Sequence, residues 1–355
     1  MALRDDLKIN DLILQNQTFA IYRLPNENRL FFNGQANNSF RIIPAIESIN
    51  GQSGFVIAPF RVSEKCPIIF IETEKESVFE IPDIIESNEE NENVREQPSS
   101  DYSSRFKVFS QALADKAFEK LVLSHCMIVP KNSDFSPANV FYRACKRYIR
   151  SYIYLFHTPQ TGTWIGSTPE LLLSGKRNKW HTVAMAGTQT LVNGKLPETW
   201  SEKKKEEQQL VTDYIRNCLL SYDIYPEEKG PYSVQAGELA HLKTDFRFSL
   251  SGKHNLGKFL NVLHPTPAVC GLPKENAFKF INENEGYDRR YYSGFIGRMN
   301  SNEQTTLYVN LRCMQIENKR LLLYAGGGLL ASSDLNEEWM ETEDKLQTML
   351  RIIDN

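Results

Sequence analysis

Residues 324–345 read YAGGGLLASSDLNEEWMETEDK and join a three-glycine turn to an acidic segment. After Ser333 apolar residues recur at the i, i+4 and i+7 spacing of an amphipathic helix, and they are Leu335, Trp339, Leu346, Met349, Leu350 and Ile353. Asp334, with Glu337 three residues later, is typical of a capping box. The stretch therefore predicts a glycine-rich bend followed by a C-terminal helix that packs against the rest of the chain.

The charged residues of this predicted helix fall on two sides of it. At about 100° per residue, one set lies opposite the apolar stripe, namely Glu337, Asp344 and Arg351. A second set shares a face at the border of the packed side, namely Glu338, Glu341 and Lys345. Two carboxylates and an ammonium there make a candidate metal and anion site. A solvated ladder of ion pairs is the alternative, which the spacing alone favours because charge runs usually lie on solvated faces.

Composition narrows the class of protein. The 355 residues are 41% hydrophobic and 24% charged, as in a globular protein with a large core. A net charge of −3 provides no field for nucleic acid or an anionic membrane. Neither a signal peptide nor an apolar run of about 20 residues is present, so we expect a cytoplasmic protein. The six scattered cysteines indicate reduced thiols, with no zinc site.

The pattern along the chain predicts one α/β (α+β) domain over residues 1–355. Short apolar runs between 11 and 71 alternate with turn residues and indicate an antiparallel sheet, the main part of an N-terminal region 1–100. The polar tract 86–100 predicts a mobile surface loop. Helices are expected at 101–119, 137–150 and 203–220, with strands between them.

Four charged residues stand in apolar segments. Lys120 opens the strand KLVLSHCMIV, and its ammonium either snorkels outward or is held in a pocket. Glu170 precedes three leucines and is either a surface charge or a desolvated acid with a raised pKa. Glu207 lies on the apolar face of its helix and needs a partner, which a metal would provide. Arg312, set among apolar neighbours, is expected to meet a carboxylate.

Two glycine turns complete this inventory. Gly187, followed by Thr188, lets a backbone N–H approach an anion closely, and the turn at 326–328 does the same near the C-terminus. The chain contains no Walker loop, G-x-G-x-x-G, H-E-x-x-H or G-x-S-x-G motif. The candidate residues suit a small dianion bound with a hard divalent cation.

In their order along the chain, nine segments, with a glutamate-bearing helix between the third and the fourth, together resemble the chorismate-utilising enzymes, and among them most closely the isochorismate synthases. They are KLVLSH (120–125), GTWIGSTPELLL (162–173), AMAGT (184–188), HLKT (241–244), LHPTPAVCGLPK (263–274), RRYYSG (289–294), LRC (311–313), YAGGGLLASSD (324–334) and EEWMETEDKL (337–346). The resemblance extends from about residue 105 to 350, whereas the first 100 residues match only loosely, through FAIYRLP (19–25).

The resemblance implies two antiparallel β-sheets flanked by helices in one large domain, with the active site between them and residues 101–355 as the catalytic region. It also implies Mg2+ as cofactor. Glu207 and Glu341 would hold the metal, Glu338 would act through water, and the metal would bind the ring carboxylate of chorismate.

The resemblance also assigns residues to the substrate. Gly187, Thr188 and Lys345 would assist at the ring carboxylate. The enolpyruvyl carboxylate would be bound by Arg312, Tyr292 and the Gly326–Gly328 turn, and His241 would lie beside the ring.

The implied chemistry needs two residues on opposite faces of the ring. Lys120, neutral through desolvation, would activate water to attack C2, and Glu170, kept protonated, would donate to the departing C4 hydroxyl. Burial shifts both pKa values in the required direction. The isomerase product, isochorismate, would feed menaquinone synthesis or, as an alternative, a siderophore. A salicylate synthase, which goes on to eliminate pyruvate, is the competing activity.

Subfamily features favour water as the nucleophile. Lys120 stands where ammonia-using relatives typically carry glutamine, and Ala186 stands where aminodeoxychorismate synthases often carry a nucleophilic lysine. We therefore expect no glutaminase subunit and a monomer. The chain departs from the family pattern at several positions, none of which removes a proposed catalytic or metal group: His125, Gln208, Cys270, Arg290 and Arg298.

Overall fold

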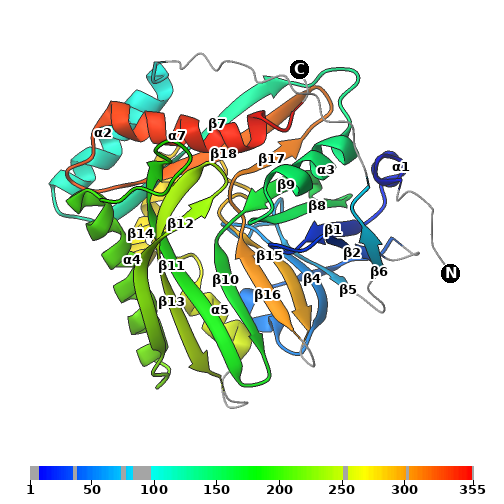
Figure 1. Cartoon of the computed structure of the whole chain (residues 1–355), viewed down its shortest axis with the longest axis horizontal. Helices are drawn as coiled ribbons and strands as arrows, with labels where there is room; N and C mark the ends of the chain where they lie inside the picture. The colour runs from blue at the N-terminus through cyan, green and yellow to red at the C-terminus, as the bar shows by residue number, and fades with distance from the viewer. Residues whose placement is uncertain are drawn as a thin grey trace.

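The computed structural model describes residues 8–34, 38–72, 77–82, 97–250, 255–300 and 304–353. These residues form two antiparallel sheets packed face to face, with helices on both outer sides (Figure 1). The predicted fold class, α/β (α+β) with two antiparallel sheets flanked by helices, is confirmed.

The first sheet carries the strand of Lys120 and the glycine-rich strand. Its order is β14 (Gly271–Leu272), β7 (Lys120–Pro130), β18 (Arg320–Leu329), β17 (Cys313–Ile316), β9 (Gly162–Thr168), β8 (Tyr152–Thr158), β1 (Phe19–Arg23), β2 (Arg29–Gly34) and β6 (Ser77–Glu80). β7 and β18 pair along ten positions, from Pro130 opposite Arg320 to Leu121 opposite Leu329. This long ladder fixes Lys120 beside the glycines of β18.

The second sheet carries the strand of Gly187. Its order is β12 (Glu227–Ala236), β13 (Leu239–Ser249), β11 (Lys179–Thr190), β10 (Leu171–Lys176), β16 (Thr305–Val309), β15 (Phe295–Asn300), β4 (Ser53–Ala58), β5 (Ile68–Glu72) and β3 (Arg41–Ile43). The pairing of β11 with β13 shifts register between Ala186 and Thr188, which marks a β-bulge at Gly187.

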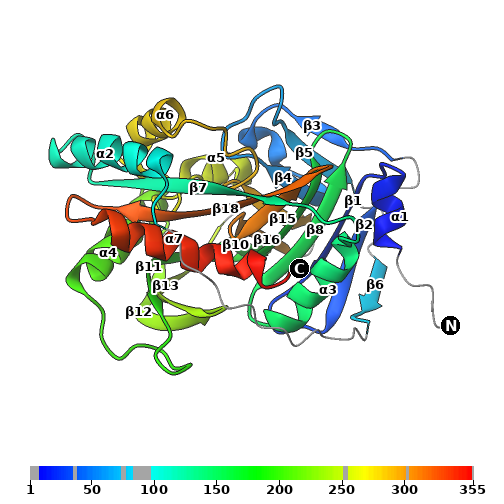
Figure 2. The same ribbon diagram turned by 90° about the horizontal axis from the view of Figure 1, so that it is seen from above.

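The helices cover the outer faces of the sheets. α2 (Ser100–Ala114), α3 (Pro137–Arg147), α6 (Lys274–Asn284) and α7 (Leu335–Leu350) lie against the first sheet. α4 (Glu202–Leu220) lies against the second sheet and packs on α5 (Leu256–Leu263), while α1 (Ile9–Leu14) packs on α3. A 3-10 turn, η1, spans Ile46–Ile49. Seen from above, α7 runs alongside β18 (Figure 2).

Aromatic rings fill the space between the two sheets. Tyr152 of the first sheet stacks on Tyr308 of the second, with ring centroids 4.3 Å apart. The same buried cluster contains Trp164 from β9 and Phe55 from β4. Burial of large rings from both sheets makes the two layers one hydrophobic unit. It also holds the facing strand ends, where the candidate site lies, in fixed positions.

Local sequence signals explain where the helices begin. Asp334 caps α7 by accepting hydrogen bonds from the backbone N–H groups of Asn336 and Glu337 at 2.9 and 3.1 Å. Ser99 caps α2 in the same way. α2 ends at Ala114, five residues before the predicted end, and Lys116 takes the left-handed conformation with φ 58°.

The sequence predicted an antiparallel sheet and a surface loop in the N-terminal region. The runs between 11 and 71 do form antiparallel strands, but β1 and β2 join the first sheet whereas β3, β4 and β5 join the second. The prediction of one sheet there is wrong, because alternation of apolar residues does not specify which neighbour a strand pairs with. Residues 86–96 of the predicted loop lie outside the described residues. Near the end of that tract, Ser99 caps α2, which begins at Ser100.

A buried ion pair ties α6 to the first sheet. The Arg289 guanidinium donates to both Glu285 carboxylate oxygens at 2.6 and 2.7 Å, and both side chains are buried. Arg289 also donates to the backbone carbonyls of Val122 and Val269 at 2.9 and 2.7 Å. Ser124 donates its backbone N–H and hydroxyl to Glu285. The pair thus links β7, the bend at 264–270 and the end of α6.

Replacing Arg289 with methionine should lower the free energy of unfolding by about 3–5 kcal/mol, because Glu285 would remain buried without its cation. Urea denaturation followed by circular dichroism measures the change. Lys279→Met is the matched control, since it breaks the exposed Lys279–Glu283 pair of the same helix and should cost less than about 0.5 kcal/mol. Equal losses in the two variants would contradict the linking role of Arg289.

Candidate active site

A cavity of about 610 Å³ lies between the two sheets. Its polar lining comes from Glu170, Glu207, His241, Arg312 and Lys345. Gly187, Thr188, Tyr292, Gly326 and Gly328 also line it. Ten of the thirteen predicted site residues therefore meet in one cavity. The other three, Lys120, Glu338 and Glu341, lie at its border through contacts described below.

Glu170 is a buried acid at the edge of the cavity. It stands at the junction of β9 and β10, where its carbonyl accepts the N–H of Val309 at 3.0 Å. The side chain is 5% exposed. Burial raises the pKa of Glu170 to about 8, although the charges of Lys120, Lys345 and Arg312 act in the opposite direction. Of the two interpretations of the sequence, the desolvated acid is the correct one.

Lys120 is held inside the protein by an ion pair. Its side chain is 0% exposed, and Nζ lies 3.1 Å from Oε1 of Glu207. Nζ makes no hydrogen bond with any other residue that the structure describes. The snorkelling interpretation is therefore wrong.

The pair of Lys120 and Glu207 depends on Gly328. A Cβ atom at this position would collide with Oε1 of Glu207 and lie 2.7 Å from Cε of Lys120. The neighbouring Gly327 faces the helix glutamates, because a Cβ there would lie 3.1 Å from Oε2 of Glu338 and 3.7 Å from Oε1 of Glu341. Three carboxylates from two helices thus approach the backbone of one glycine segment.

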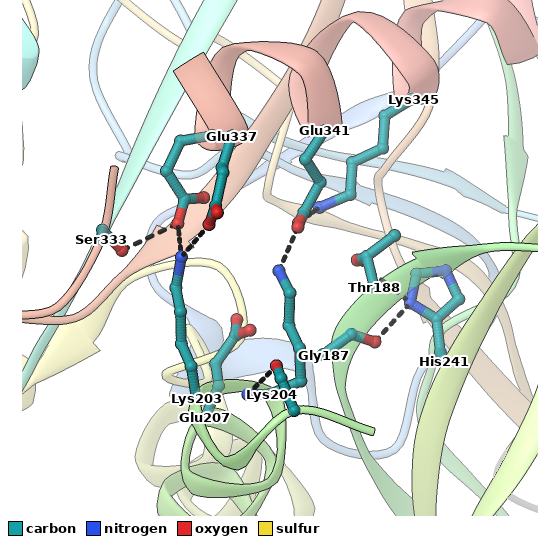
Figure 3. Close-up of polar contacts among 12 residues, drawn as sticks. Gly187, Thr188, Lys203, Lys204, Glu207, His241, Ser333, Glu337, Glu341 and Lys345 are labelled. Atoms are coloured by element: carbon teal, nitrogen blue, oxygen red, sulfur yellow. Dashed lines mark hydrogen bonds and ion pairs between the residues drawn. The ribbon is translucent and has the colours of Figure 1, made fainter. Parts of the chain in front are cut away.

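Lysines from α4 and α7 neutralise two of the glutamates of α7, Glu338 and Glu341. Figure 3 shows Lys204 and Lys345 at the carboxylate of Glu341. Oε1 of Glu338 accepts from Lys203 at 2.5 Å and from the Ser333 hydroxyl at 2.7 Å. Glu341 accepts from Lys345 at 2.8 Å through Oε1 and from Lys204 through Oε2. Glu338 is 1% exposed, so this face of α7 is a set of buried ion pairs and not a solvated ladder.

The surroundings change the pKa values of the two glutamates in opposite directions. Burial and the charge of Glu341 raise the pKa of Glu338. Burial alone would also raise the pKa of Glu341, but the ammonium groups of Lys345 and Lys204 outweigh it and lower that pKa. Glu341 is therefore an ionised carboxylate inside the protein.

The three carboxylates fit a hard divalent cation. No group of three His, Cys, Asp or Glu side chains among the described residues is close enough to coordinate a metal in the present arrangement. Oε2 of Glu338, however, is buried without a hydrogen-bond partner in the described part of the chain. Carboxylate oxygens are the ligands that Mg2+ prefers, and the lysine ammonium groups supply the positive charge that these carboxylates require.

Arg312 is held by neutral groups. It donates to the Ala236 carbonyl at 2.7 Å and to Nε2 of His241 at 2.5 Å. No carboxylate of the described residues pairs with Arg312, and the guanidinium faces the cavity. Burial lowers the pKa of Arg312 to about 10. A buried cation whose protein partners are neutral leaves its charge available to an anionic ligand.

His241 orients Arg312. Burial, followed by the charge of Arg312, keeps the pKa of His241 well below its usual range, so the ring is neutral. Nδ1 lies 3.2 Å from the Gly187 carbonyl, which assigns the proton to that nitrogen and leaves Nε2 as the acceptor for Arg312. The structure thus gives His241 a contact with Arg312 that its position in the strand did not reveal.

Gln208 supports the Gly187 bulge. Its Oε1 accepts the N–H of Ala186 at 2.8 Å, and its Nε2 donates to the Ala184 carbonyl at 3.1 Å. Gln208 is 1% exposed, so it fixes the backbone that presents Gly187 and Thr188 to the cavity. The sequence identified Gln208 only as a departure from the family pattern. Its place next to Glu207 on a core-facing helix turn was the available signal.

Three further departures from the family pattern lie away from the cavity lining, namely Cys270, His125 and Arg290. Cys270 is fully buried in the cluster of α2 and α6. His125 packs against Trp339, and Arg290 pairs with Glu317 at 3.1 Å. These residues therefore alter the packing around the site and leave its charged groups in place. All six cysteines are free thiols, as predicted.

Gln208→Leu should remove the acceptor for the Ala186 N–H and lower the free energy of unfolding by about 1–3 kcal/mol. Amide hydrogen exchange at Ala186 should accelerate, because the bulge loses its support. Gln209→Leu is the control, since Gln209 is exposed and bonds only Asp213 in the described residues. An unchanged exchange rate at Ala186 in Gln208→Leu would show that Gln208 does not fix the bulge.

Comparisons with known proteins identify the family. The chorismate binding enzyme family matches residues 61–354. Isochorismate synthase EntC of Escherichia coli is 30% identical over 210 residues, which cover 56% of this chain and 54% of EntC. Isochorismate synthase MenF of Haemophilus influenzae is 32% identical over 213 residues, or 57% of this chain and 48% of that protein. The matched region thus spans about half the length of these relatives.

Among solved structures, the menaquinone-specific isochorismate synthase MenF from Escherichia coli superposes with a TM-score of 0.78. The superposition covers 100% of this chain and 93% of the other at 19% identity, a level that supports a common fold. No helix in the described part of the chain is both long and apolar enough to span a membrane. From the extent of the family match and the shared fold, the chain belongs to the chorismate binding enzyme family.

Proposed function

We propose that this protein is an isochorismate synthase that isomerises chorismate to isochorismate with Mg2+. The observation that carries the proposal is a buried glutamate with a pKa of about 8, Glu170, which faces a cavity shared with Arg312 and Lys345. A carboxylic acid that is still protonated near neutral pH is a suitable proton donor for a leaving hydroxyl. The named activity of the curated relatives supports the same assignment.

The charges of the cavity suit the two carboxylates of chorismate. Arg312, free of any anionic partner among the described residues, is proposed to bind the enolpyruvyl carboxylate. Tyr292 and the backbone of Gly326 and Gly328 line the same part of the cavity. The ring carboxylate is proposed to lie near Gly187, Thr188 and Lys345, on the side of α7.

Glu207 and Glu341 are proposed to hold Mg2+, with Glu338 acting through water. The chemistry that the ion supplies when bound is fixation of the ring carboxylate and neutralisation of the surrounding carboxylates. Lys120 would then lack the anionic partner that Glu207 now provides at 3.1 Å. Lys120 would then be free of that contact and available to the attacking water.

The proposed reaction exchanges one water for another. Lys120 accepts a proton from water as the water oxygen bonds to C2 of the ring. The ring double bonds shift and the C4–O bond breaks, while Glu170 gives its proton to the departing hydroxyl, which leaves as water. Return of a proton from Lys120 to Glu170 restores the starting state, so the reaction needs no redox partner.

We also propose that the product feeds menaquinone synthesis and that the enzyme acts as a cytoplasmic monomer without a glutaminase subunit. The fate of the product is proposed on general grounds alone, and the genes adjacent to its own would test it. The alternative pathway is that of a siderophore. Sedimentation of the pure protein tests the monomer.

The function is tested by incubating the pure protein with chorismate and Mg2+ and identifying the products by NMR. Isochorismate as the sole product is expected. Salicylate together with pyruvate would instead identify a salicylate synthase. Binding of chorismate without turnover would identify a non-catalytic chorismate-binding protein.

Glu170→Gln and Lys120→Gln should each lower kcat at least about 100-fold, because each removes a proton donor or acceptor. Circular dichroism should show an intact fold in both. Glu206→Gln, an exposed neighbour of Glu207, is the control and should keep the wild-type rate. Turnover near the wild-type rate in either site variant would refute the role of that residue.

The pH dependence of stability gives a second test of Glu170. Between its ordinary pKa of 4.5 and the folded value of about 8, the folded chain keeps a proton that the unfolded chain has released. Stability should therefore fall as pH rises through this window, by at most about 1.4 kcal/mol per pH unit. In Glu170→Gln this contribution disappears, so its Tm should decline less between pH 5 and 8. The activity of the wild type should decrease above pH 8, as Glu170 loses its proton.

A further inference from the structure

A cleft of about 730 Å³ opens on the outer side of the helix glutamates. It lies between the start of α4, the end of β11 and the exposed side of α7, and Lys203, Lys204, Glu338 and Glu341 line it. Thr188 lines both this cleft and the cavity between the sheets. The cleft therefore leads from the surface to the carboxylates that border the proposed substrate site.

Lys204 crosses this cleft to reach Glu341. Figure 3 shows its side chain extending from α4 toward the Glu341 carboxylate on α7. The two side chains are 15% and 11% exposed. The ammonium of Lys204 is paired with Glu341 alone among the described residues. Because Lys345 already occupies Oε1 of Glu341, Lys204 completes the neutralisation of this carboxylate through Oε2.

The two lysines on Glu341 differ in how they are held. Lys345 comes from the next turn of the same helix and also donates to the Gly326 carbonyl at 2.8 Å. Lys204 comes from another helix, and its flexible side chain lies in an open cleft. An incoming cation that needs an oxygen of Glu341 therefore displaces Lys204 more easily than Lys345.

Lys204 also lies close to the other groups of the site. It is one helical turn before Glu207, and its charge interacts with Glu207 and Glu338 as well as Glu341. The Lys204 carbonyl lies 3.0 Å from where a Cβ of Gly187 would be. A single ammonium thus faces all three carboxylates that are proposed to serve the cation.

We propose that Lys204 is an internal counter-cation that competes with the divalent cation for Glu341 and withdraws into the outer cleft when the cation binds. This inference rests on the Mg2+ site of the proposed function. It makes Lys204 a determinant of cation affinity: the buried carboxylate stays neutralised before the cation arrives, and displacement of the lysine weakens cation binding.

The test is calorimetric titration of Mg2+ into the full chain without chorismate. Lys204→Met should bind Mg2+ about tenfold more tightly than the wild type, because the competing charge is gone. Lys205→Met is the matched control, since it removes the same charge from the adjacent position, where Lys205 is exposed and pairs with Glu202. Its Mg2+ affinity should equal that of the wild type. Lys204→Arg, which keeps the charge, should also bind like the wild type.

Thermal unfolding provides a second readout. Without Mg2+, Lys204→Met should melt below the wild type, because Glu341 loses one of its two cations. With saturating Mg2+, its Tm should rise more than that of the wild type. Lys204→Gln, which keeps a polar group in the cleft, serves if the methionine variant does not fold.

The outcomes separate this inference from the function on which it rests. If Mg2+ binds the wild type and binds Lys204→Met no more tightly, the proposed competition is refuted and the proposed metal site stands. Mg2+ that binds neither protein overturns the metal site and the competition together. If Mg2+ affinity increases equally in Lys204→Met and Lys205→Met, the increase comes from the change in net charge. That result would also refute the specific role of Lys204.

Discussion

The absence of side chains along Gly326–Gly328 is the constraint on which the site depends. β18 is paired with β7 on one side, so its backbone cannot move away from crowded neighbours. A Cβ atom added to Gly327 or Gly328 would collide with or contact the side chains of Lys120, Glu207, Glu338 and Glu341. Any side chain at Gly328 would separate the strand lysine from the helix glutamate. The glycines therefore allow charges from three elements to meet inside the fold.

Bringing these charges together requires that each be compensated. The carboxylates of Glu207, Glu338 and Glu341 each have at least one lysine, and none of them is left as an isolated buried anion. Glu170 has no such contact, and burial raises its pKa to about 8. The glutamates of the site are thus of two kinds, those paired with a lysine and the unpaired Glu170. The helix carboxylates are paired with ammonium groups, whereas burial keeps the pKa of Glu170 high.

The sequence predicted the elements well because their signals are local. The apolar spacing and the cap at Asp334 predicted α7, and the run after Lys120 predicted β7. Signals that depend on tertiary partners were weaker. Whether Lys120 pointed outward or inward depended on Glu207, which is 87 positions away in the sequence, and the pattern around Arg312 did not reveal His241. The sheet that each N-terminal strand joins was undetermined for the same reason, since alternation specifies a buried face but not a neighbour.

The pairing of Lys120 with Glu207 links binding to chemistry. Nζ of Lys120 lies 3.1 Å from Oε1 of Glu207, so the residue proposed as the base is in contact with a residue proposed as a metal ligand. Glu207 is followed in α4 by Gln208, which fixes the Gly187 bulge, so one helix turn both contacts Lys120 and supports the backbone that lines the cavity.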